Sequence, residues 1–360
     1  MSDREYLAAV YSFNYFGPAR TKLLVSFFGS AKKVWSLRKE SLVEVGISIK
    51  KTQKFIDYRN EFDINNYFNR LKKLNINFYT YKDKDYPRNL SGLSDEPLIL
   101  YYKGKIKKRD KNAVAIVGSR KITSYGRDVA TKFASELATY GATIVSGLAF
   151  GVDVAAHKAC LEAGGRAIAV LASGLDTITP VSNSWLGKEI IKKGGAIVSE
   201  YPLGHKPQKS DFPERNRIIS GLSKAVLVIE GAKKSGTLHT ASHAAEQGRQ
   251  VFAVPGQVTS PMSQAPHYLI KNGAKMATST EDVLEELDMQ LKVDHEEVEK
   301  IMPEGKDEAK ILSVLEKEPL HTDEIIRLSD LNINIVSSKL TMMEIKGVVK
   351  NLGSGMYKKT

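Results

Sequence analysis

The sequence is poor in cysteine and in long apolar runs, and each shortage excludes a class of protein. Cys160 is the single cysteine among 360 residues, so the chain cannot form an internal disulfide and lacks a cysteine-based zinc site. The longest apolar runs, such as residues 167–172, fall far short of the ~18 residues that span a bilayer. Asp3 and Glu5, with no long apolar segment after them, are atypical of a signal peptide. We therefore expect a cytoplasmic protein without a membrane segment.

Acidic residues are in the minority. Lysine and arginine number 53 against 41 aspartates and glutamates, which gives a formal net charge of +12 and a pI near 9.4. A basic excess favours polyanionic partners, either a nucleic acid or an anionic membrane surface. A lysine-rich composition can also raise the pI without any such partner. Hydrophobic residues make up 42% and charged residues 26%, which are globular proportions and exclude a wholly disordered or collagen-like chain.

The spacing of apolar residues divides the chain into three domains and a linker. Helical spacing recurs through residues 1–82 between glycine-containing turns, which predicts a helical bundle of the sterile-alpha-motif or helix-hairpin-helix type. Residues 83–288 form the next domain, and a charged linker covers 289–307. Residues 308–360 contain three short helical runs and a hairpin, which is typical of a winged helix. The near-balanced charge of this last unit leaves DNA binding, protein contact and a structural role open.

Residues 83–288 alternate short β-rich runs with amphipathic helical stretches. This alternation is typical of a parallel sheet covered by helices on both faces, and glycine-bounded apolar runs suit strands buried on both sides. We therefore expect an α/β fold with an extended Rossmann-like parallel sheet. The expected strands cover 113–117, 143–146, 167–171, 196–199, 225–229 and 251–254, and the expected helices cover 124–140, 152–163, 184–193, 214–221, 237–248 and 264–272.

Two loops at the ends of these strands carry features that attract phosphate. In an open α/β sheet, ligands bind at the carboxyl ends of strands, where helix N-termini favour anions. One loop contains Gly-Ser-Arg at 118–120, and the other contains Ser-Gly-Thr at 235–237 before an alanine-rich helix. Neither loop matches GxGxxG or the Walker A pattern, so dinucleotide binding is weakly indicated and P-loop ATP hydrolysis is unsupported. The first loop could equally be an ordinary turn with a surface arginine.

A third loop combines an aromatic residue with cations. Its residues of interest are Lys206, Lys209, Phe212, Arg215, Asn216 and Arg217. Single-stranded nucleic acid needs both chemistries, because bases stack on rings at ~1–3 kcal/mol per base while cations follow the backbone. The alternative is an arginine–carboxylate network that holds the loop, with Glu200 or Glu214 as partner. We favour nucleic-acid contact, because several phosphate-binding loops along one edge suit a polymer better than a mononucleotide.

Two histidine-containing patterns are weaker. Asp153 and His157 would share a helix face after a glycine-rich loop and could form an acid–base pair. We favour the interpretation that Asp153 orders the glycine loop while His157 packs nearby. His239 and His243 have helical spacing but lack the HExxH pattern, so packing is favoured over metal binding. We predict no catalytic residue, no metal and no cofactor.

Together these motifs resemble the DNA processing protein A family, also called Smf. The resemblance rests on VGSR at 117–120, SGLAFGVDVAAH at 146–157, FPERNRIISGLS at 212–223 and the run over 226–256, in the family's order. It implies an extended Rossmann domain between an N-terminal helical domain and a C-terminal winged helix. It also implies a protein without enzymatic activity that binds single-stranded DNA, protects incoming strands in natural transformation and loads the RecA recombinase. Family members commonly act as homodimers through the Rossmann domain.

The resemblance also implies a set of DNA-binding residues: Gly118, Ser119, Arg120, Lys209, Phe212, Arg215, Asn216, Arg217, Ser235, Gly236 and Thr237. Phe212 would stack on a base, while Lys209, Arg215 and Arg217 would contact phosphates. Asn216 would orient the arginines or the DNA. The three residues at 235–237 would form a second phosphate-binding loop, and Lys206 could replace Lys209.

The chain departs from the family pattern in a few loops, and two other functions compete. Phe150 stands where the family usually has arginine, and residues 179–183 and 263–267 also differ. A Rossmann-like nucleotide phosphoribohydrolase of the lysine-decarboxylase-like type is the alternative function, although residues 231–237 lack the glycine pair of that group. A DNA-binding regulator acting through the winged helix is a third possibility, against which the near-neutral charge of that unit argues.

Overall fold

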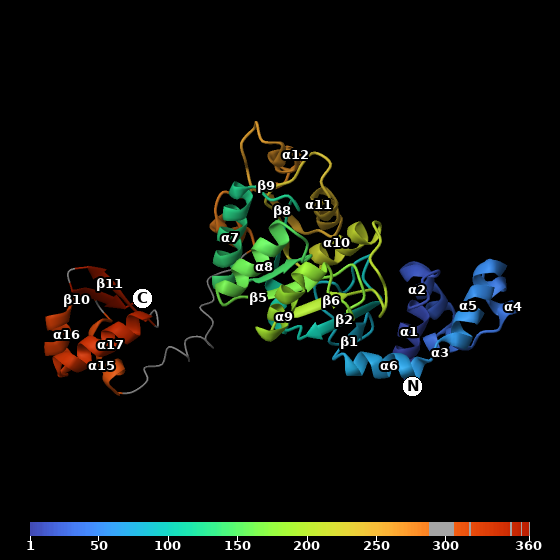
Figure 1. Cartoon of the computed structure of the whole chain (residues 1–360), viewed down its shortest axis with the longest axis horizontal. Coiled ribbons are helices and arrows are strands. Elements are labelled where there is room, and N and C mark those ends of the chain that lie inside the picture. The colour runs from blue at the N-terminus through green and yellow to red at the C-terminus, as the bar shows by residue number, and fades with distance from the viewer. Residues whose placement is uncertain (288–305, 317, 346–347, 354, 360) are drawn as a thin grey trace. The chain divides into compact units, whose positions relative to one another are not determined.

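The chain folds into two units in a computed structural model that describes residues 1–287, 306–316, 318–345, 348–353 and 355–359. Contacts divide the chain into residues 1–290 and residues 291–360, and each unit is described by itself (Figure 1). No helix within the described ranges is long and apolar enough to cross a membrane.

Six helices precede the first strand, which confirms the helical prediction for this part. They are α1 (Asp3–Tyr11), α2 (Gly17–Phe28), α3 (Ala31–Ser36), α4 (Lys39–Glu44), α5 (Ile49–Glu61) and α6 (Ile64–Lys73). Ser2 and Glu5 form a capping box that satisfies the first amides of α1. Gly29, at φ 84°, ends α2 in the left-handed conformation that glycine adopts without strain. The helices pack around an aromatic core in which Phe55 contacts Phe13 and Phe16.

A nine-stranded sheet follows, in the order β1-β2-β6-β5-β4-β3-β7-β8-β9. Strands β3 to β8 are parallel to one another in this order, whereas β2 pairs antiparallel with both β1 and β6. The predicted parallel sheet is therefore confirmed, with an antiparallel extension at one edge. The strands are β1 (Asn77–Thr80), β2 (Ile99–Gly104), β3 (Ala113–Val117), β4 (Thr143–Ser146), β5 (Arg166–Val170), β6 (Ala196–Ser199), β7 (Ala225–Val228), β8 (Gln250–Ala253) and β9 (Lys275–Met276).

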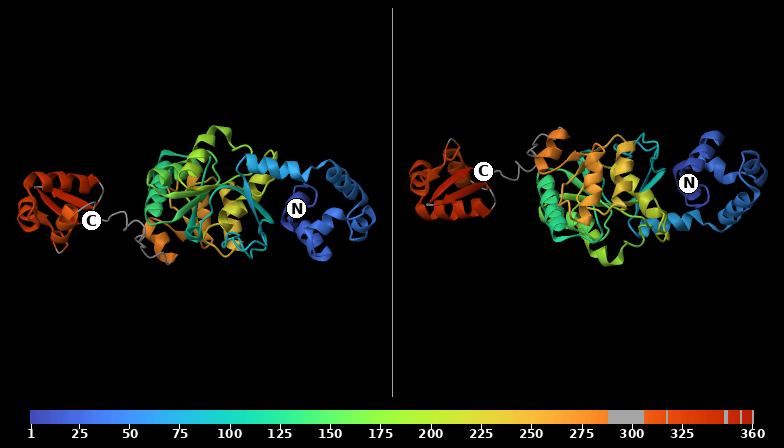
Figure 2. Two further views of the ribbon diagram at one scale, coloured as in Figure 1. Left: turned by 90° about the horizontal axis from the view of Figure 1, so that it is seen from below. Right: turned by 90° about the horizontal axis from the view of Figure 1, so that it is seen from above.

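Helices cover both faces of the sheet (Figure 2). They are α7 (Ser124–Thr139), α8 (Val152–Glu162), α9 (Ser184–Lys192), α10 (Asp211–Gly221), α11 (Thr237–Glu246), α12 (Gln264–Lys271) and α13 (Thr280–Glu286), with short 3-10 turns η1 (Lys108–Asn112), η2 (Val181–Asn183) and η3 (Pro261–Ser263). Successive residues of β3 enter different cores. Ile116 belongs to the core that includes α7 and α8 residues, whereas Ala115 and Val117 belong to the core that includes α10 and α11 residues. This alternation explains why β3 is apolar at every position.

The sheet begins earlier in the chain than the expected domain boundary at 82/83. Strand β1 lies on the helical side of that boundary and pairs with β2. Both strands fall in segments that sequence patterning treats as helical or transitional, because a four-residue strand after a helix carries little periodic signal. Residues 103–111 are rich in lysine and arginine, and they include the end of β2 and most of the turn η1.

The described part of the second unit contains three helices and a small sheet, which confirms the predicted winged helix. Its elements are α15 (Lys306–Val314), β10 (Leu320–His321), α16 (Thr322–Ser329), α17 (Ile333–Ile345), β11 (Val349–Gly353) and β12 (Met356–Lys359), with strand order β10-β12-β11. Ile311, Ile325 and Leu340 from the three helices meet in one core. The expected linker over 289–307 lies outside the described residues apart from its last two positions.

Candidate nucleic-acid interface

Loops from several strands meet along one edge of the sheet. Because β3 to β8 are parallel, the loops that follow them leave from the same edge. We call residues 118–123, 147–151, 200–210 and 229–237 the rim. All three segments singled out from the sequence, including α10 with Phe212, lie on or next to it.

The loop at 118–120 is held by a close approach to α8. A side chain on Gly118 would overlap Val152, and a side chain on Gly151 would overlap the backbone of Ser119 and Arg120. The Val152 amide also donates to the Ser119 carbonyl at 3.2 Å. The Ser119 hydroxyl exchanges hydrogen bonds of 3.0 Å with the backbone of Lys121, so it turns back into its own loop. The Arg120 side chain remains exposed.

A buried carboxylate joins the loop after β3 to the loop after β7. Glu230, which is 3% exposed, accepts from the Thr123 amide at 2.9 Å and from the Thr123 hydroxyl at 2.8 Å. Thr123 in turn caps α7 by accepting from the Gly126 amide at 3.0 Å. A side chain on Gly126 would overlap the Glu230 carboxylate, so any larger residue there must displace a carboxylate that Thr123 holds. The start of α7 and the loop at 229–237 therefore form one fixed body.

Arg120 and Phe212 meet although 92 positions of numbering separate them. The Arg120 guanidinium carbon lies 4.9 Å from the centre of the Phe212 ring, in a cation–π arrangement. Arg120 is exposed and Phe212 is half-buried at the start of α10. The structure thus brings together the first and third sequence motifs, one as an exposed cation and the other as an aromatic ring.

The lysines before Phe212 lie on a loop that Asp211 fixes. Its carboxylate accepts from the Gln208 amide at 2.7 Å and lies 2.7 Å from Nε2 of His205. The His205 ring stacks on Tyr201, with centroids 4.3 Å apart. Lys206 and Lys209 are both exposed on this loop, so the structure does not distinguish between them.

Arg215 is buried, which corrects the expectation that it contacts phosphate. Only 4% of its surface is exposed, and its guanidinium donates to the carbonyls of Gly147, at 2.8 Å, and Val170. Burial lowers the pKa of Arg215 to about 10, although the nearby Asp153 carboxylate opposes this shift. Its Nε donates to the Asn216 side-chain oxygen at 3.2 Å, so Asn216 orients an arginine as expected. Arg215 supports the loop at 147–151 from below.

Arg217 is also buried, at 6% exposure. Its burial likewise corrects the expectation that it contacts phosphate. Its guanidinium donates to the Glu200 carboxylate, which is 4% exposed, and to the Asp95 carbonyl. Glu200 also accepts from the Tyr11 hydroxyl of α1 at 3.2 Å. The carboxylate network named as the alternative therefore describes Arg217, because α10 turns this side chain away from the rim and into the protein.

The loop at 235–237 begins α11. Thr237 is buried and donates its hydroxyl to Ser235 Oγ at 2.9 Å, while its amide donates to the same oxygen at 3.3 Å. Gly236 is exposed, and a side chain there would meet open space. Lys233 and Lys234 before it are exposed as well. These residues place a helix N-terminus and two cations on the rim, which is a suitable environment for phosphate.

Asp153 orders the glycine loop, and His157 lies one turn further along the same helix, α8. The Asp153 carboxylate accepts from the amides of Gly147, at 3.0 Å, and Ala149, at 3.3 Å, so it orders the loop as favoured from the sequence. Burial raises the pKa of Asp153, and the Arg215 charge opposes that rise. His157 is fully buried, which lowers its pKa to about 4.

The ordered glycine loop displays an aromatic side chain. Leu148 holds a positive φ of 56°, a strained conformation for a branched residue, and the Asn183 amide donates to its carbonyl at 2.8 Å. Phe150 is 51% exposed at the end of this loop, one residue before the glycine that touches Arg120. Phe150, where the resemblance implies an arginine, therefore exposes an aromatic ring on the rim.

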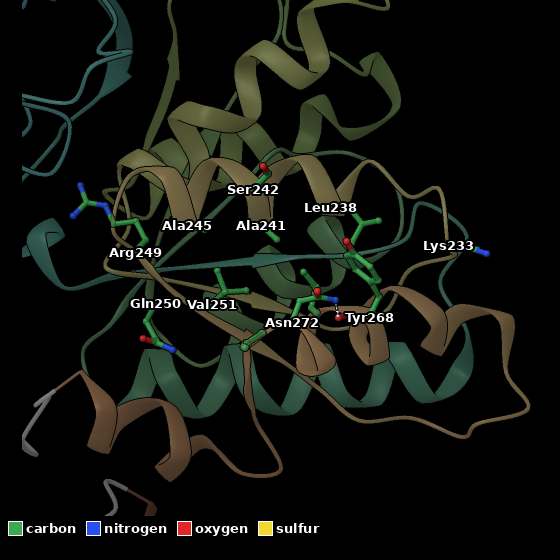
Figure 3. A pocket seen from close by; sticks show the side chains of 13 residues that line it. Lys233, Leu238, Ala241, Ser242, Ala245, Arg249, Gln250, Val251, Tyr268 and Asn272 are labelled. Carbon is green, nitrogen blue, oxygen red and sulfur yellow. Dashed lines mark hydrogen bonds between the residues drawn. The ribbon is translucent and has the colours of Figure 1, made fainter.

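A pocket of about 670 Å³ lies between α11 and α12 (Figure 3). Lys233 and Arg249 lie at its two ends, and Leu238, Ala241 and Tyr268 are among the residues between them. All thirteen of its lining residues are described, and none is acidic or a histidine. This pocket therefore offers neither a carboxylate nor an imidazole for the phosphoribohydrolase alternative. No group of three or more histidine, cysteine or acidic side chains in the described ranges could hold a metal ion.

Two family models match the chain. Residues 77–288 match DNA recombination-mediator protein A, and residues 296–355 match the DprA winged helix domain. Protein Smf of Synechocystis sp. (strain ATCC 27184 / PCC 6803 / Kazusa) is 36% identical over 97% of this chain and 96% of its own length. Protein Smf of Escherichia coli (strain K12) is 43% identical over 68% of this chain and 66% of its own length.

Two solved structures are similar to this fold. The X-ray structure of DNA processing protein A from Streptococcus pneumoniae superposes with a TM-score of 0.65 at 34% identity, over 79% of this chain and 98% of that chain. A structure of DNA processing protein A from Helicobacter pylori, reported for its single-stranded DNA binding mode, superposes with a TM-score of 0.52 at 31% identity. The second match covers 58% of this chain and 95% of that chain.

Proposed function

This chain belongs to the DNA recombination-mediator protein A family, and on that premise we propose that it binds single-stranded DNA along the rim. The observation that carries the proposal is the Arg120–Phe212 pair, which presents a cation and an aromatic ring within 4.9 Å. Single strands are bound by this combination, because bases stack on rings and cations follow phosphates. Lys206, Lys209 and the start of α11 extend the cationic surface on either side.

The buried arginines take a supporting role in this proposal. Arg215 holds the loop at 147–151 and Arg217 holds Glu200, so both fix the surface without contacting the strand. Gly118, Ser119 and Asn216 likewise shape the loops. Direct contacts fall to Arg120, Phe212 and the exposed lysines, with Ser235, Gly236 and Thr237 at the second phosphate-binding loop.

Fluorescence anisotropy with matched single-stranded and double-stranded oligonucleotides across a salt series tests the proposal. We expect tighter binding to the single strand, with affinity that falls as salt rises, because phosphate contacts release counterions. Duplex preference would move DNA binding to the winged helix. No binding to either oligonucleotide would contradict the proposal, and release of free base from nucleoside monophosphates would then favour the hydrolase alternative.

We further propose the finer roles that the family resemblance implies: protection of incoming strands in natural transformation, loading of RecA, and homodimerisation through the Rossmann-like domain. Assembly of RecA on strands already coated by a single-strand-binding protein tests loading, and this chain should shorten the delay before assembly. Light scattering after size exclusion tests the dimer, which should have twice the 39.8 kDa mass of the chain. An unchanged delay would contradict RecA loading, and a monomer would contradict homodimerisation.

A further inference from the structure

A second basic surface lies at the opposite edge of the sheet from the rim. A groove of about 1010 Å³ runs between the loop after β1 and the segment that contains η1. Because η1 leads directly into the amino end of β3, the groove lies at the amino ends of the parallel strands. The five residues of β3 separate the two edges by roughly 16 Å, at about 3.3 Å per residue.

The groove presents cations on its surface, and two of its three acids, Asp83 and Asp110 but not the exposed Asp85, are paired with arginines. Six exposed basic residues line it: Lys84, Arg88, Lys107, Lys108, Arg109 and Lys111. Of its three acids, Asp110 is buried and accepts from Arg166 Nη2 at 2.7 Å and from the Lys107 amide at 2.7 Å. Asp83 lies 3.1 Å from Arg4, outside the groove. Two of the three negative charges are therefore neutralised by arginines that do not line the groove.

The walls of the groove are fixed by hydrogen bonds. The Asn89 side-chain amide donates to the carbonyls of Leu222, at 2.8 Å, and Lys111, at 3.2 Å, which ties one wall to the other. The Tyr86 hydroxyl donates to the Pro97 carbonyl at 2.8 Å. Tyr79 is another lining residue, and its ring stacks on Tyr102 with centroids 4.6 Å apart. The groove therefore exists without a ligand and costs little ordering energy to fill.

We propose that this groove is a second binding site for nucleic-acid phosphates, which holds the part of a single strand that extends beyond the rim. An adjoining hollow shares Arg88 and Lys111 and adds Lys224, so the cationic path continues past the groove. A recessed cationic channel with an aromatic side chain among its lining residues suits a polyanionic strand. A membrane surface is disfavoured, because none of the described lining residues is a large apolar side chain exposed for insertion.

The test compares two full-length variants of equal net charge. The groove variant carries Lys84→Gln, Lys107→Gln, Lys108→Gln and Lys111→Gln. The control carries four changes of exposed lysines on α7, α8 and α9: Lys132→Gln, Lys158→Gln, Lys188→Gln and Lys192→Gln. Labelled oligothymidylates of about 6 and about 30 nucleotides are bound across a salt series, because one single-strand site covers ~4–16 nucleotides.

The groove variant should bind the long strand about tenfold more weakly at low salt, with a salt slope lowered by about 2–3, at ~0.7 per lost phosphate contact. It should bind the short strand as the unchanged protein does, and the control should bind both normally. If both variants lost the same affinity for the long strand, the loss would be due to net charge alone, and the proposal would be overturned. Unchanged binding of the long strand by the groove variant would overturn it as well.

The proposal rests on the proposed function, and the two can fail separately. If the unchanged protein binds neither oligonucleotide, the rim proposal fails; if it binds both and the groove variant matches it, only the groove proposal fails. Sedimentation with vesicles of anionic phosphatidylglycerol provides the third arm. Loss of vesicle binding in the groove variant with intact DNA binding would assign the groove to lipid and overturn the proposal.

A chemical footprint keeps the test independent of folding of the variants. Lysine acetylation of the unchanged protein should be reduced at 84, 107, 108 and 111 by the long strand and not by the short one. Protection of the control lysines to the same extent would contradict a defined second site.

Discussion

Arg120 and Phe212 contribute different physical terms to the same contact. A ring provides stacking energy that does not depend on salt, whereas an exposed guanidinium provides a phosphate contact whose strength falls with salt. Because the two side chains also touch each other, at 4.9 Å, their effects will not be fully additive.

Phe212→Ala should weaken single-strand binding by about 5- to 150-fold, which corresponds to ~1–3 kcal/mol of stacking, with the salt slope unchanged. Arg120→Gln should weaken binding and lower the slope by about 0.7. Anisotropy titrations at several salt concentrations separate the two outcomes. If both variants bound the strand with unchanged affinity, the rim would not be the DNA-binding surface.

Arg217 should behave as a structural residue. Removal of one member of a buried ion pair leaves the other charge uncompensated and costs about 3–5 kcal/mol. Arg217→Met should therefore lower the free energy of unfolding by that amount, measured by urea denaturation, because Glu200 is 4% exposed. The double variant Arg217→Met with Glu200→Gln should recover part of the loss. If the single variant were as stable as the unchanged protein but bound DNA weakly, the result would support the phosphate contact that the sequence predicted for Arg217.

Residue types in the site were easier to predict than their orientation. The Arg120–Phe212 contact joins two motifs that the sequence singled out separately. Arg215 and Arg217 are also cations in the same motif, but both side chains are buried. Arg215 donates to backbone carbonyls and Arg217 pairs with a carboxylate. The presence of Glu200 within the same segment was the available signal, because a buried carboxylate needs a cation. The groove at the amino edge needed the fold, because the segments at 84–91 and 106–111 meet only there.

At the scale of elements, the alternation of strands and helices located most of the sheet. Each expected strand from 113 to 254 is present with its ends displaced by one residue at most. These strands are buried on both faces and bounded by glycine, so their signal is strong. Strands β1 and β9 lie at the edges of the sheet and are mostly exposed or half-buried, so they lack the continuous apolar run that marks the inner strands.

The buried His157 of α8 should make the folded protein less stable in mild acid. Burial lowers the pKa of His157 to about 4, below its ordinary value of 6.5, so the unfolded chain binds the proton first as pH falls. Stability is fully present above pH 6.5 and is lost as pH falls toward 4. The loss amounts to about 2 kcal/mol between about pH 7.5 and pH 5.

Urea denaturation at both pH values measures this loss in the unchanged protein and in His157→Leu. The variant should show a pH dependence that is smaller by the amount assigned to His157, whatever its stability at neutral pH. An equal pH dependence in the two proteins would mean that His157 does not account for the acid sensitivity.

At the scale of the molecule, the rim and the groove both belong to residues 1–290, and the winged helix is a separate unit. A chain that ends at residue 290 keeps both surfaces and their supporting core. We expect its affinity for single-stranded oligonucleotides to remain within about threefold, or ~0.6 kcal/mol, of the full chain, since no direct contact is removed. Anisotropy of the two chains measures the ratio. Loss of binding would place the main DNA contacts in the winged helix.

Two rim positions, 123 and 230, and position 126 in the first turn of α7 are interdependent through volume and charge. Glu230 fills the space that a side chain at 126 would need, and Thr123 supplies both of the hydrogen bonds that its carboxylate accepts. An alanine at 126 would push the carboxylate of residue 230 off Thr123, and loss of that carboxylate would leave the amide of 123 without its acceptor. Substitutions at these positions should therefore be inherited as pairs, and a single change should persist only where a second has already occurred.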